Sequence, residues 1–184
     1  MIVLNLEPPA NPFVSLAEAK ARLRVDGGED DAQITALLMA AQAHLEGPQG
    51  WLGRTIARQQ LEARIACAPH NVSLPYPPFH QLVSVAAVAL DGTPTEIDLA
   101  DVRIEPGRFG SAVISPKAGR WGSERLRVRY TAGYEVGDPR AAPIHAAILL
   151  MVGHLYDNRE AVTDRPMTEL PMGVESLLAP LQVW

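Results

Sequence analysis

The chain has 184 residues, of which 47% are hydrophobic and 20% are charged, and its formal net charge at pH 7 is -5. These values are ordinary for a globular protein, so they argue against disorder or a coiled coil, and the length fits one domain or one domain that carries a subdomain. The negative charge argues against a protein that wraps nucleic acid with its whole surface, because Lys and Arg dominate affinity for phosphate.

Two helices are predicted near the N-terminus. The prolines among residues 1–12 are expected to keep that segment extended, after which Ser15 and Glu18 form a capping box for a helix running to about Arg24. A second helix is predicted to begin near Asp30, whose carboxylate is expected to cap it. Apolar residues at helical spacing predict one buried face on that helix, made of Ile34, Leu37, Leu38, Ala41 and Leu45.

Residues 53–131 change from helical to alternating spacing, with frequent Pro and Gly, which predicts a β-rich insert. This part carries ten basic and seven acidic side chains, whereas the remainder carries six basic and fourteen acidic ones. Two hairpins are predicted, one with the turn Asp91-Gly92 between residues 83–90 and 96–99, the other between residues 102–105 and 112–114. One strand is predicted to bury a face made of Leu61, Ala63, Ile65 and Cys67.

A basic stripe is predicted at the end of the insert. Arg125, Arg127 and Arg129 alternate with apolar residues and therefore share one face of a strand. Such a stripe is a candidate contact face for a phosphate backbone or an acidic partner. A solvated strand face is the commoner explanation of the same pattern.

The C-terminal third is predicted to hold one long helix and one short one. Pro143 suits the first turn of the long helix, and the polar residues 161–171 that follow it are expected to form a mobile loop. Pro180 limits the last helix to about two turns, which is too short to be stable alone, so it must dock. Docking on the chain's own helices and docking on another protein are equal alternatives, and a terminal Trp favours the second. The candidate docking residues are Val174, Leu177, Leu178, Leu181 and Trp184.

No catalytic, cofactor-binding or metal-binding residues are predicted. The five histidines include no pair at the spacing of a helical metal site. A small hydrolase using His154 and Asp157 is an alternative, but no nucleophile elbow supports it. Cys67 is the only cysteine, so no intrachain disulfide is expected, and a buried structural thiol is preferred to a nucleophile.

A reducing, cytoplasmic environment and no membrane span are expected. Residues 1–7 lack the basic and apolar regions of a secretion signal, and no eighteen apolar residues follow one another. The predicted fold class is α+β, a small antiparallel helical bundle with an inserted small antiparallel β-sheet subdomain. Its predicted parts are N-terminal helices in residues 1–52, the β-rich insert in 53–131, the main helix in 132–160, and the loop and docking segment in 161–184.

Short motifs recur in a fixed order along these parts. They are Ser15-Leu16-Ala17-Glu18-Ala19-Lys20 with Leu23, Asp30-Asp31 with Ile34 and Leu38, Gly53-Arg54 with Thr55, Leu74-Pro75 with Pro77-Pro78, Val128-Arg129-Tyr130-Thr131-Ala132-Gly133-Tyr134, Ala147-Ile148 with Tyr156-Asp157-Asn158-Arg159-Glu160, and Leu170-Pro171 with Val174 and Leu177-Leu178. The ordered set resembles the head-to-tail connector (adaptor) family of long-tailed bacteriophages and phage-derived gene transfer agents. The resemblance covers nearly the whole chain.

The resemblance implies a structural protein of a virion or gene-transfer-agent particle, assembled in the bacterial cytoplasm, with no enzyme activity and no cofactor. It implies a homo-oligomeric ring, commonly twelvefold in that family, beneath the portal protein. A stopper or tail-completion protein would bind the opposite surface, and DNA would pass through the centre without sequence-specific binding. Many members have a Pro-Tyr-Arg-like ending where this chain has Pro180-Leu181-Gln182-Val183-Trp184. A stopper or tail-completion protein is the alternative within the same particle.

Overall fold

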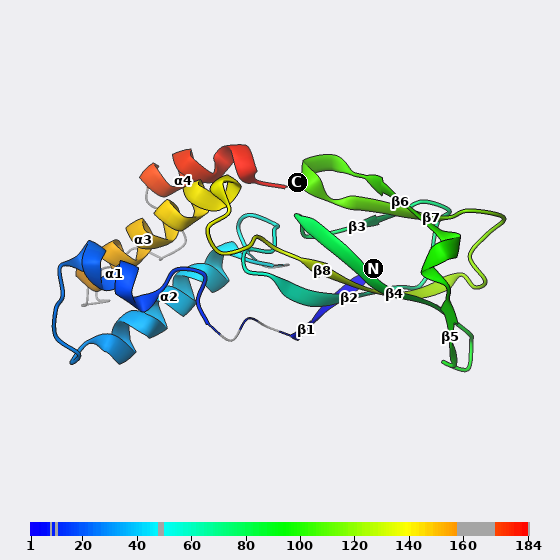
Figure 1. Ribbon diagram of the computed structural model, residues 1–184, viewed down its shortest axis with the longest axis horizontal. Coiled ribbons are helices and arrows are strands. Elements are labelled where there is room, and N and C mark those ends of the chain that lie inside the picture. The colour runs from blue at the N-terminus through cyan, green and yellow to red at the C-terminus, as the bar shows by residue number, and fades with distance from the viewer. Residues whose placement is uncertain (8, 10, 48–49, 158–171, 184) are drawn as a thin grey trace, which may run out of the picture. The chain divides into compact units, whose positions relative to one another are not determined.

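The computed structural model describes residues 1–7, 9, 11–47, 50–157 and 172–183. It divides the chain into two compact units, which are drawn in Figure 1. The β unit consists of Met1–Pro9 and Ala57–Gly133, and the helical unit consists of Ala10–Ile56 and Tyr134–Trp184. The α+β class is therefore confirmed, but the β part is nearly half of the chain and was wrongly predicted to be a small inserted sheet.

Two antiparallel sheets make up the β unit. The first has the strand order β1-β2-β8-β4-β5 and the second has the order β3-β7-β6. The strands of the first sheet are β1 (Ile2–Glu7), β2 (Gln59–Ile65), β8 (Arg125–Ala132), β4 (Phe79–Val88) and β5 (Pro94–Ile97). Those of the second are β3 (Val72–Leu74), β7 (Ala112–Pro116) and β6 (Val102–Pro106).

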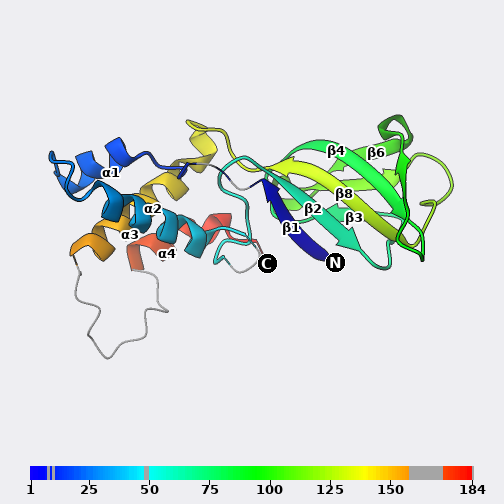
Figure 2. The ribbon, with the colours of Figure 1, turned by 90° about the horizontal axis from the view of Figure 1, so that it is seen from below.

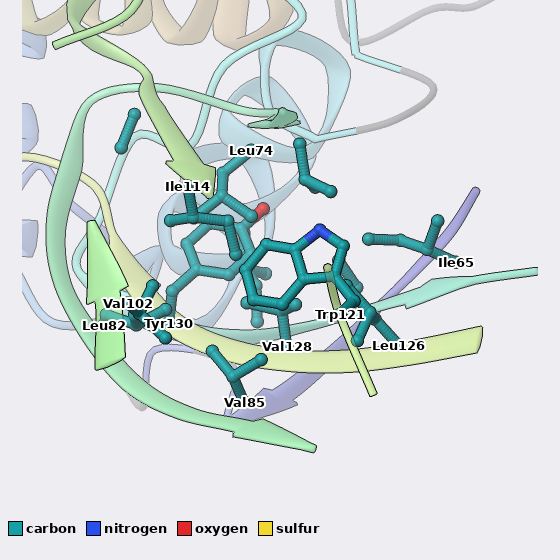
Figure 3. Packing of buried hydrophobic residues seen from close by; sticks show 14 of the residues in the cluster. Ile65, Leu74, Leu82, Val85, Val102, Ile114, Trp121, Leu126, Val128 and Tyr130 are labelled. Atoms are coloured by element: carbon teal, nitrogen blue, oxygen red, sulfur yellow. The ribbon is translucent and has the colours of Figure 1, made fainter. Parts of the chain in front are cut away.

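One hydrophobic core holds the β unit together, and Figure 3 shows its side chains at close range. Tyr130 from β8 is fully buried at its centre, stacked on Phe79 with 6.4 Å between ring centroids. Leu74 and Ile114 contribute from the second sheet, and Val85 from the first. The inner faces of both sheets are apolar because alternate residues of each strand point to the same side.

Both predicted hairpins are confirmed, with β4 pairing β5 and β6 pairing β7. The prediction for Cys67 is wrong, because β2 ends at Ile65 and the thiol is exposed beyond the strand. Alternation correctly identified Leu61, Ala63 and Ile65 as buried residues of β2, but it cannot show where a strand stops pairing.

The helical unit contains four α-helices. They are α1 (Leu16–Leu23), α2 (Asp31–Leu45), α3 (Ala142–Asp157) and α4 (Met172–Leu178). Ile34 and Leu38 of α2 and Ile144 and Ile148 of α3 are all less than 2% exposed, so the facing apolar stripes form the core of this unit. The short 3-10 helices of the chain are η1 (Leu99–Asp101), η2 (Arg108–Gly110), η3 (Pro139–Ala141) and η4 (Ala179–Leu181). Within the described part of the chain, no helix is long and apolar enough to cross a membrane.

The two predicted helix starts have different outcomes. Ser15 and Glu18 form the expected capping box. Asp30 stands at the N-cap of α2, but its side chain makes no cap hydrogen bond, so that part of the prediction is wrong. Its carboxylate instead accepts a hydrogen bond from the hydroxyl of Tyr156, which ties the start of α2 to the end of α3. Asp30 thus makes a long-range hydrogen bond with Tyr156 in place of the expected local cap of α2.

Gly133 follows β8 and needs the conformational freedom of glycine. Its φ is +110°, and a Cβ atom there would lie 2.4 Å from the carbonyl oxygen of Ala57. Gly133→Ala is therefore expected to lower the free energy of unfolding by about 2–4 kcal/mol, the sum of left-handed strain and overpacking. Gly137 is the matched control, because its φ is +84° and no atom lies within 4 Å of the added Cβ. Urea denaturation measures the free energy of unfolding of both variants. If Gly133→Ala and Gly137→Ala lowered it equally, the steric explanation would be wrong.

Candidate functional site

The first of the two predicted contact regions is the C-terminal segment, and its helix α4 lies against α3 of the same unit. Val174 and Leu178 of α4 are 0% exposed, and α4 contacts α3. Leu177 is 38% exposed on the other side of the helix. Leu181 is half-buried, and Trp184 lies outside the described residues. The predicted docking residues are thus divided between an inner face and an outer face.

Backbone and side-chain hydrogen bonds hold the chain after α4. The backbone N–H of Val183 donates to the carbonyl of Leu52 at 3.0 Å, and the side-chain amide of Gln182 donates to the carbonyl of Trp51 at 3.0 Å. Residues 181–183 therefore run beside the loop formed by residues 50–56, although 127 or more positions separate the partners of each bond. We call residues 181–183 the tail and residues 50–56 the tail-binding loop.

Arg54 is the central residue of the tail-binding loop. It is only 5% exposed, and its guanidinium donates to the carbonyl of Leu181 and, at 3.3 Å, to the hydroxyl of Tyr134. Gly53 lets the tail approach, since its φ is +62° and a Cβ there would lie 2.8 Å from the carbonyl oxygen of Val183. The motif Gly53-Arg54 thus has a structural role in fixing the tail.

The basic stripe, the second predicted region, lies on the outer face of the five-stranded sheet. Arg127 and Arg129 alternate with buried residues of β8, and their neighbours on β2 are Arg64 and Glu62. Arg127 lies 3.7 Å from Glu96. Arg125 is exposed and has no ion pair with a described acidic side chain. The stripe is therefore partly neutralised by its own sheet.

Glu62 is the acidic group that pairs with Arg129 of the stripe. Its side chain is 1% exposed and bonds the guanidinium groups of Arg129 at 2.8 Å and Arg64 at 2.7 Å. Burial acts to raise the pKa of the Glu62 carboxyl, but the hydrogen bonds from Arg129 and Arg64 outweigh it and hold that pKa below its ordinary value. The buried carboxylate thus orients two arginines at the surface of the sheet.

This arrangement makes stability depend on pH. Because the pKa of Glu62 is lower in the folded chain, its stabilising effect is complete above about pH 4.5 and is lost as the pH falls through the folded-state value. We expect Glu62→Gln to lower the free energy of unfolding by about 1–3 kcal/mol at pH 7, and the gap to the unsubstituted chain to narrow in acid.

The control is Glu96→Gln, since Glu96 is 62% exposed and its contact with Arg127 is long. That variant should change stability by less than about 1 kcal/mol at either pH. Urea denaturation at pH 7 and in acid measures both variants. If Glu62→Gln lowered the free energy of unfolding equally at pH 7 and in acid, the pH dependence would not come from the Glu62 carboxylate.

The remaining candidates for chemistry are dispersed. His154 and Asp157 are both exposed near the end of α3, and His145 lies 3.1 Å from Glu18 of α1. Among the residues that the structure describes, no group of three or more His, Cys, Asp or Glu side chains could hold a metal ion. A pocket of about 560 Å³ lies in the β unit and is lined by His70, Arg120, Trp121 and neighbouring residues.

Sequence reasoning missed one buried charged residue in each unit, Arg54 in the helical unit and Glu62 in the β unit. Arg54 was noted only as part of a motif, and no local pattern shows that a charged residue will be buried by a segment more than a hundred positions away. The burial of Glu62 does not follow from alternation, because the guanidinium groups that bond its carboxylate come from Arg64 on its own strand and Arg129 on the neighbouring one. A carboxylate between basic positions of paired strands is the signal that could have revealed it.

The comparison with protein-family models finds no match, and that with curated proteins finds none either. Solved structures do show the same fold. A chain from the neck of an empty GTA (gene transfer agent) particle, computed with C6 symmetry, superposes with a TM-score of 0.78 at 19% identity, covering 100% of this chain and 96% of that one. A chain from a native gene-transfer-agent virion gives 0.76 at 20% identity with the same coverage. One from the native neck, computed with C12 symmetry, gives 0.77 at 19% identity, again with the same coverage.

Proposed function

We propose that this chain is a structural subunit of the neck of a gene-transfer-agent or tailed-phage particle. In this role it forms a ring under the portal protein and joins the DNA-filled head to the tail. The observation that carries the proposal is the full-length likeness to chains of gene-transfer-agent necks, since both the helical unit and the β unit take part in it. The protein is not an enzyme under this proposal.

The proposed portal contact is the C-terminal segment. Val174 and Leu178 hold α4 in place from the inside, which leaves Leu177 and the tail to meet the portal. Trp184 follows directly after the tail and completes the candidate set, because Trp is enriched where binding energy concentrates. A stopper or tail-completion protein would bind on the other side of the ring.

The proposed DNA passage is consistent with the charge of the chain. A net charge of -5 disfavours tight binding of phosphate, so DNA can move through without being held. Arg125 is the arginine of the stripe that stays free to approach an acidic surface, whereas Arg127 and Arg129 have acidic neighbours. The proposal therefore assigns the stripe a weak, sequence-independent contact.

Light scattering tests the proposal directly. The purified chain is measured alone and after mixing with the portal protein from the same gene neighbourhood. A ring-sized species, or a portal complex carrying many copies, is the expected result. A monomer that ignores the portal but captures a tail protein would favour the stopper alternative, and turnover lost in His154→Ala would favour the hydrolase.

A pair of single substitutions tests the portal contact. Leu177→Asp should weaken portal binding at least about tenfold, which is 1.4 kcal/mol, because it places a charge in an apolar contact. Met39 on α2 is the control, being 60% exposed in the same unit. Met39→Asp should bind portal normally. Equal binding of both variants would remove the C-terminal segment from the contact, and Trp184→Ala extends the test to the last residue.

A further inference from the structure

The edge strand β1 is exposed and apolar. It pairs only with β2, so its outer row of backbone N–H and C=O groups has no strand partner among the described residues. Ile2 is 65% exposed, Leu4 36% and Leu6 38%. A long apolar edge of this kind is a template for pairing with another chain, and proteins normally protect such edges.

The other edge of the same sheet is protected, which makes β1 distinctive. Strand β5 has four residues and contains Pro94 and Glu96, a proline and a charge that both discourage pairing. Strand β1 has six residues, contains no Pro, and carries its one charged residue, Glu7, at its last position. Its exposure is therefore a feature that another surface is expected to cover.

A second apolar edge lies on the opposite side of the β unit. Figures 1 and 2 both show β6 far from β1 within that unit. Strand β6 is an edge of the three-stranded sheet, and its Ile104 is 47% exposed. Leu99 in η1 before it is 40% exposed, and Phe109 in η2 after it is 51% exposed. The two edges have similar lengths of five and six residues.

Two different patches on opposite sides of one unit suit a head-to-tail contact. A ring needs such a heterologous contact, in which one surface of a subunit meets another surface of the next. Pairing of β1 with β1 would instead close a twofold dimer and stop there. The neck chains that share this fold were solved with six- and twelvefold symmetry.

The geometry points to a contact between copies of this chain, in which the β1 edge of one subunit packs on the β6 edge of the next. This inference rests on the proposed ring. The occupant of the β1 edge is a second copy, because the chain itself supplies an apolar edge of matching length on the far side. Burial of Leu4 and Ile104 at the contact would remove both from water.

Chemical crosslinking tests the contact. In a Cys67→Ser background, Leu4→Cys and Ile104→Cys introduce one thiol on each edge, at positions that are already exposed. The variant is mixed with portal protein and treated with a short bismaleimide, and the sample is examined by light scattering and by denaturing gel. The double variant should give a ladder beyond the dimer, whereas each single variant should stay monomeric on the gel.

The gel and the light scattering together distinguish failure of the proposed contact from failure of the proposed ring. A ring-sized species without a ladder overturns the contact and leaves the proposed function intact. A crosslinked ladder on the gel at high protein concentration, without a ring-sized species in light scattering, would support the contact and contradict the proposed ring. Absence of both overturns both. Dimers formed by Leu4→Cys alone would show β1 pairing with itself and overturn the head-to-tail arrangement.

A charge substitution gives an independent measurement. Leu4→Lys should weaken self-association at least tenfold, because the new ammonium group would be buried in the contact. Val83→Lys is the control, since Val83 is 41% exposed on β4, away from either edge. Circular dichroism verifies that both variants fold. Equal weakening of self-association by the two substitutions, or none by Leu4→Lys, would refute the contact.

Discussion

Leu178→Ala should lower the free energy of unfolding of the helical unit by about 2–5 kcal/mol. The side chain is 0% exposed, and α4, which carries it, is too short to be stable without its contacts with α3. Truncation of the Leu178 side chain leaves a cavity and weakens the attachment of α4 and the tail. Urea denaturation followed by helical circular dichroism measures the loss, and hydrogen exchange in α3 assigns it to this unit.

Leu177→Ala is the matched control, one residue earlier on the same helix. Leu177 is 38% exposed, so its truncation should cost less than about 1 kcal/mol. Deletion of residues 173–184 removes Val174 and Leu178 together, and we expect it to unfold the helical unit. If that deletion lost portal binding, the cause would be unfolding of the helical unit. Leu177→Asp leaves the buried side chains of α4 in place and therefore tests the portal contact directly. Equal costs for Leu177→Ala and Leu178→Ala would contradict the burial of α4.

Tyr130→Ala should destabilise the β unit by about 3–5 kcal/mol or more. Tyr130 is the largest of the side chains that are less than 2% exposed, and it packs between the two sheets. Its hydroxyl donates to the carbonyl of Pro75 at 2.8 Å, and burial raises the pKa of that hydroxyl, which therefore stays protonated. The substitution removes both the ring and the hydrogen bond.

Tyr130→Phe separates these two contributions. It retains the ring and its stacking on Phe79 but leaves the Pro75 carbonyl without this donor, which should cost about 1–3 kcal/mol. Thermal denaturation of both variants, read from the fluorescence of the buried Trp121 in the same core, measures the difference. A Phe variant as unstable as the Ala variant would show that the hydrogen bond, and not packing, dominates.

Local signals predicted the elements whose partners are close in sequence. The capping box at Ser15 and the two hairpins were found because each pairs residues a few positions apart. Strand β1 was predicted only to be extended, since its partner β2 begins more than fifty residues later. A six-residue apolar segment becomes a strand when another strand edge accepts its hydrogen bonds, and that acceptance is a long-range event.

The candidate site divides in the same way. The spacing of Val174, Leu177 and Leu178 predicted a docking helix, but spacing could not choose between the chain's own helices and a partner. The structure places Val174 and Leu178 inside and Leu177 outside. Alternation correctly placed Arg125, Arg127 and Arg129 on one strand face. The ion pairs of Arg127 with Glu96 and of Arg129 with Glu62 depend instead on which strands are neighbours.

The sequence by itself determined the α+β class, the helix stripes, the hairpins and the order of the elements, because periodicity and turn chemistry act over a few residues. Tertiary structure alone decided that the β unit has two sheets closed around Tyr130, that Arg54 holds the tail, and that β1 is left as an exposed apolar edge. These features depend on contacts between segments that are distant in the chain, and local periodicity does not show which of those segments come into contact.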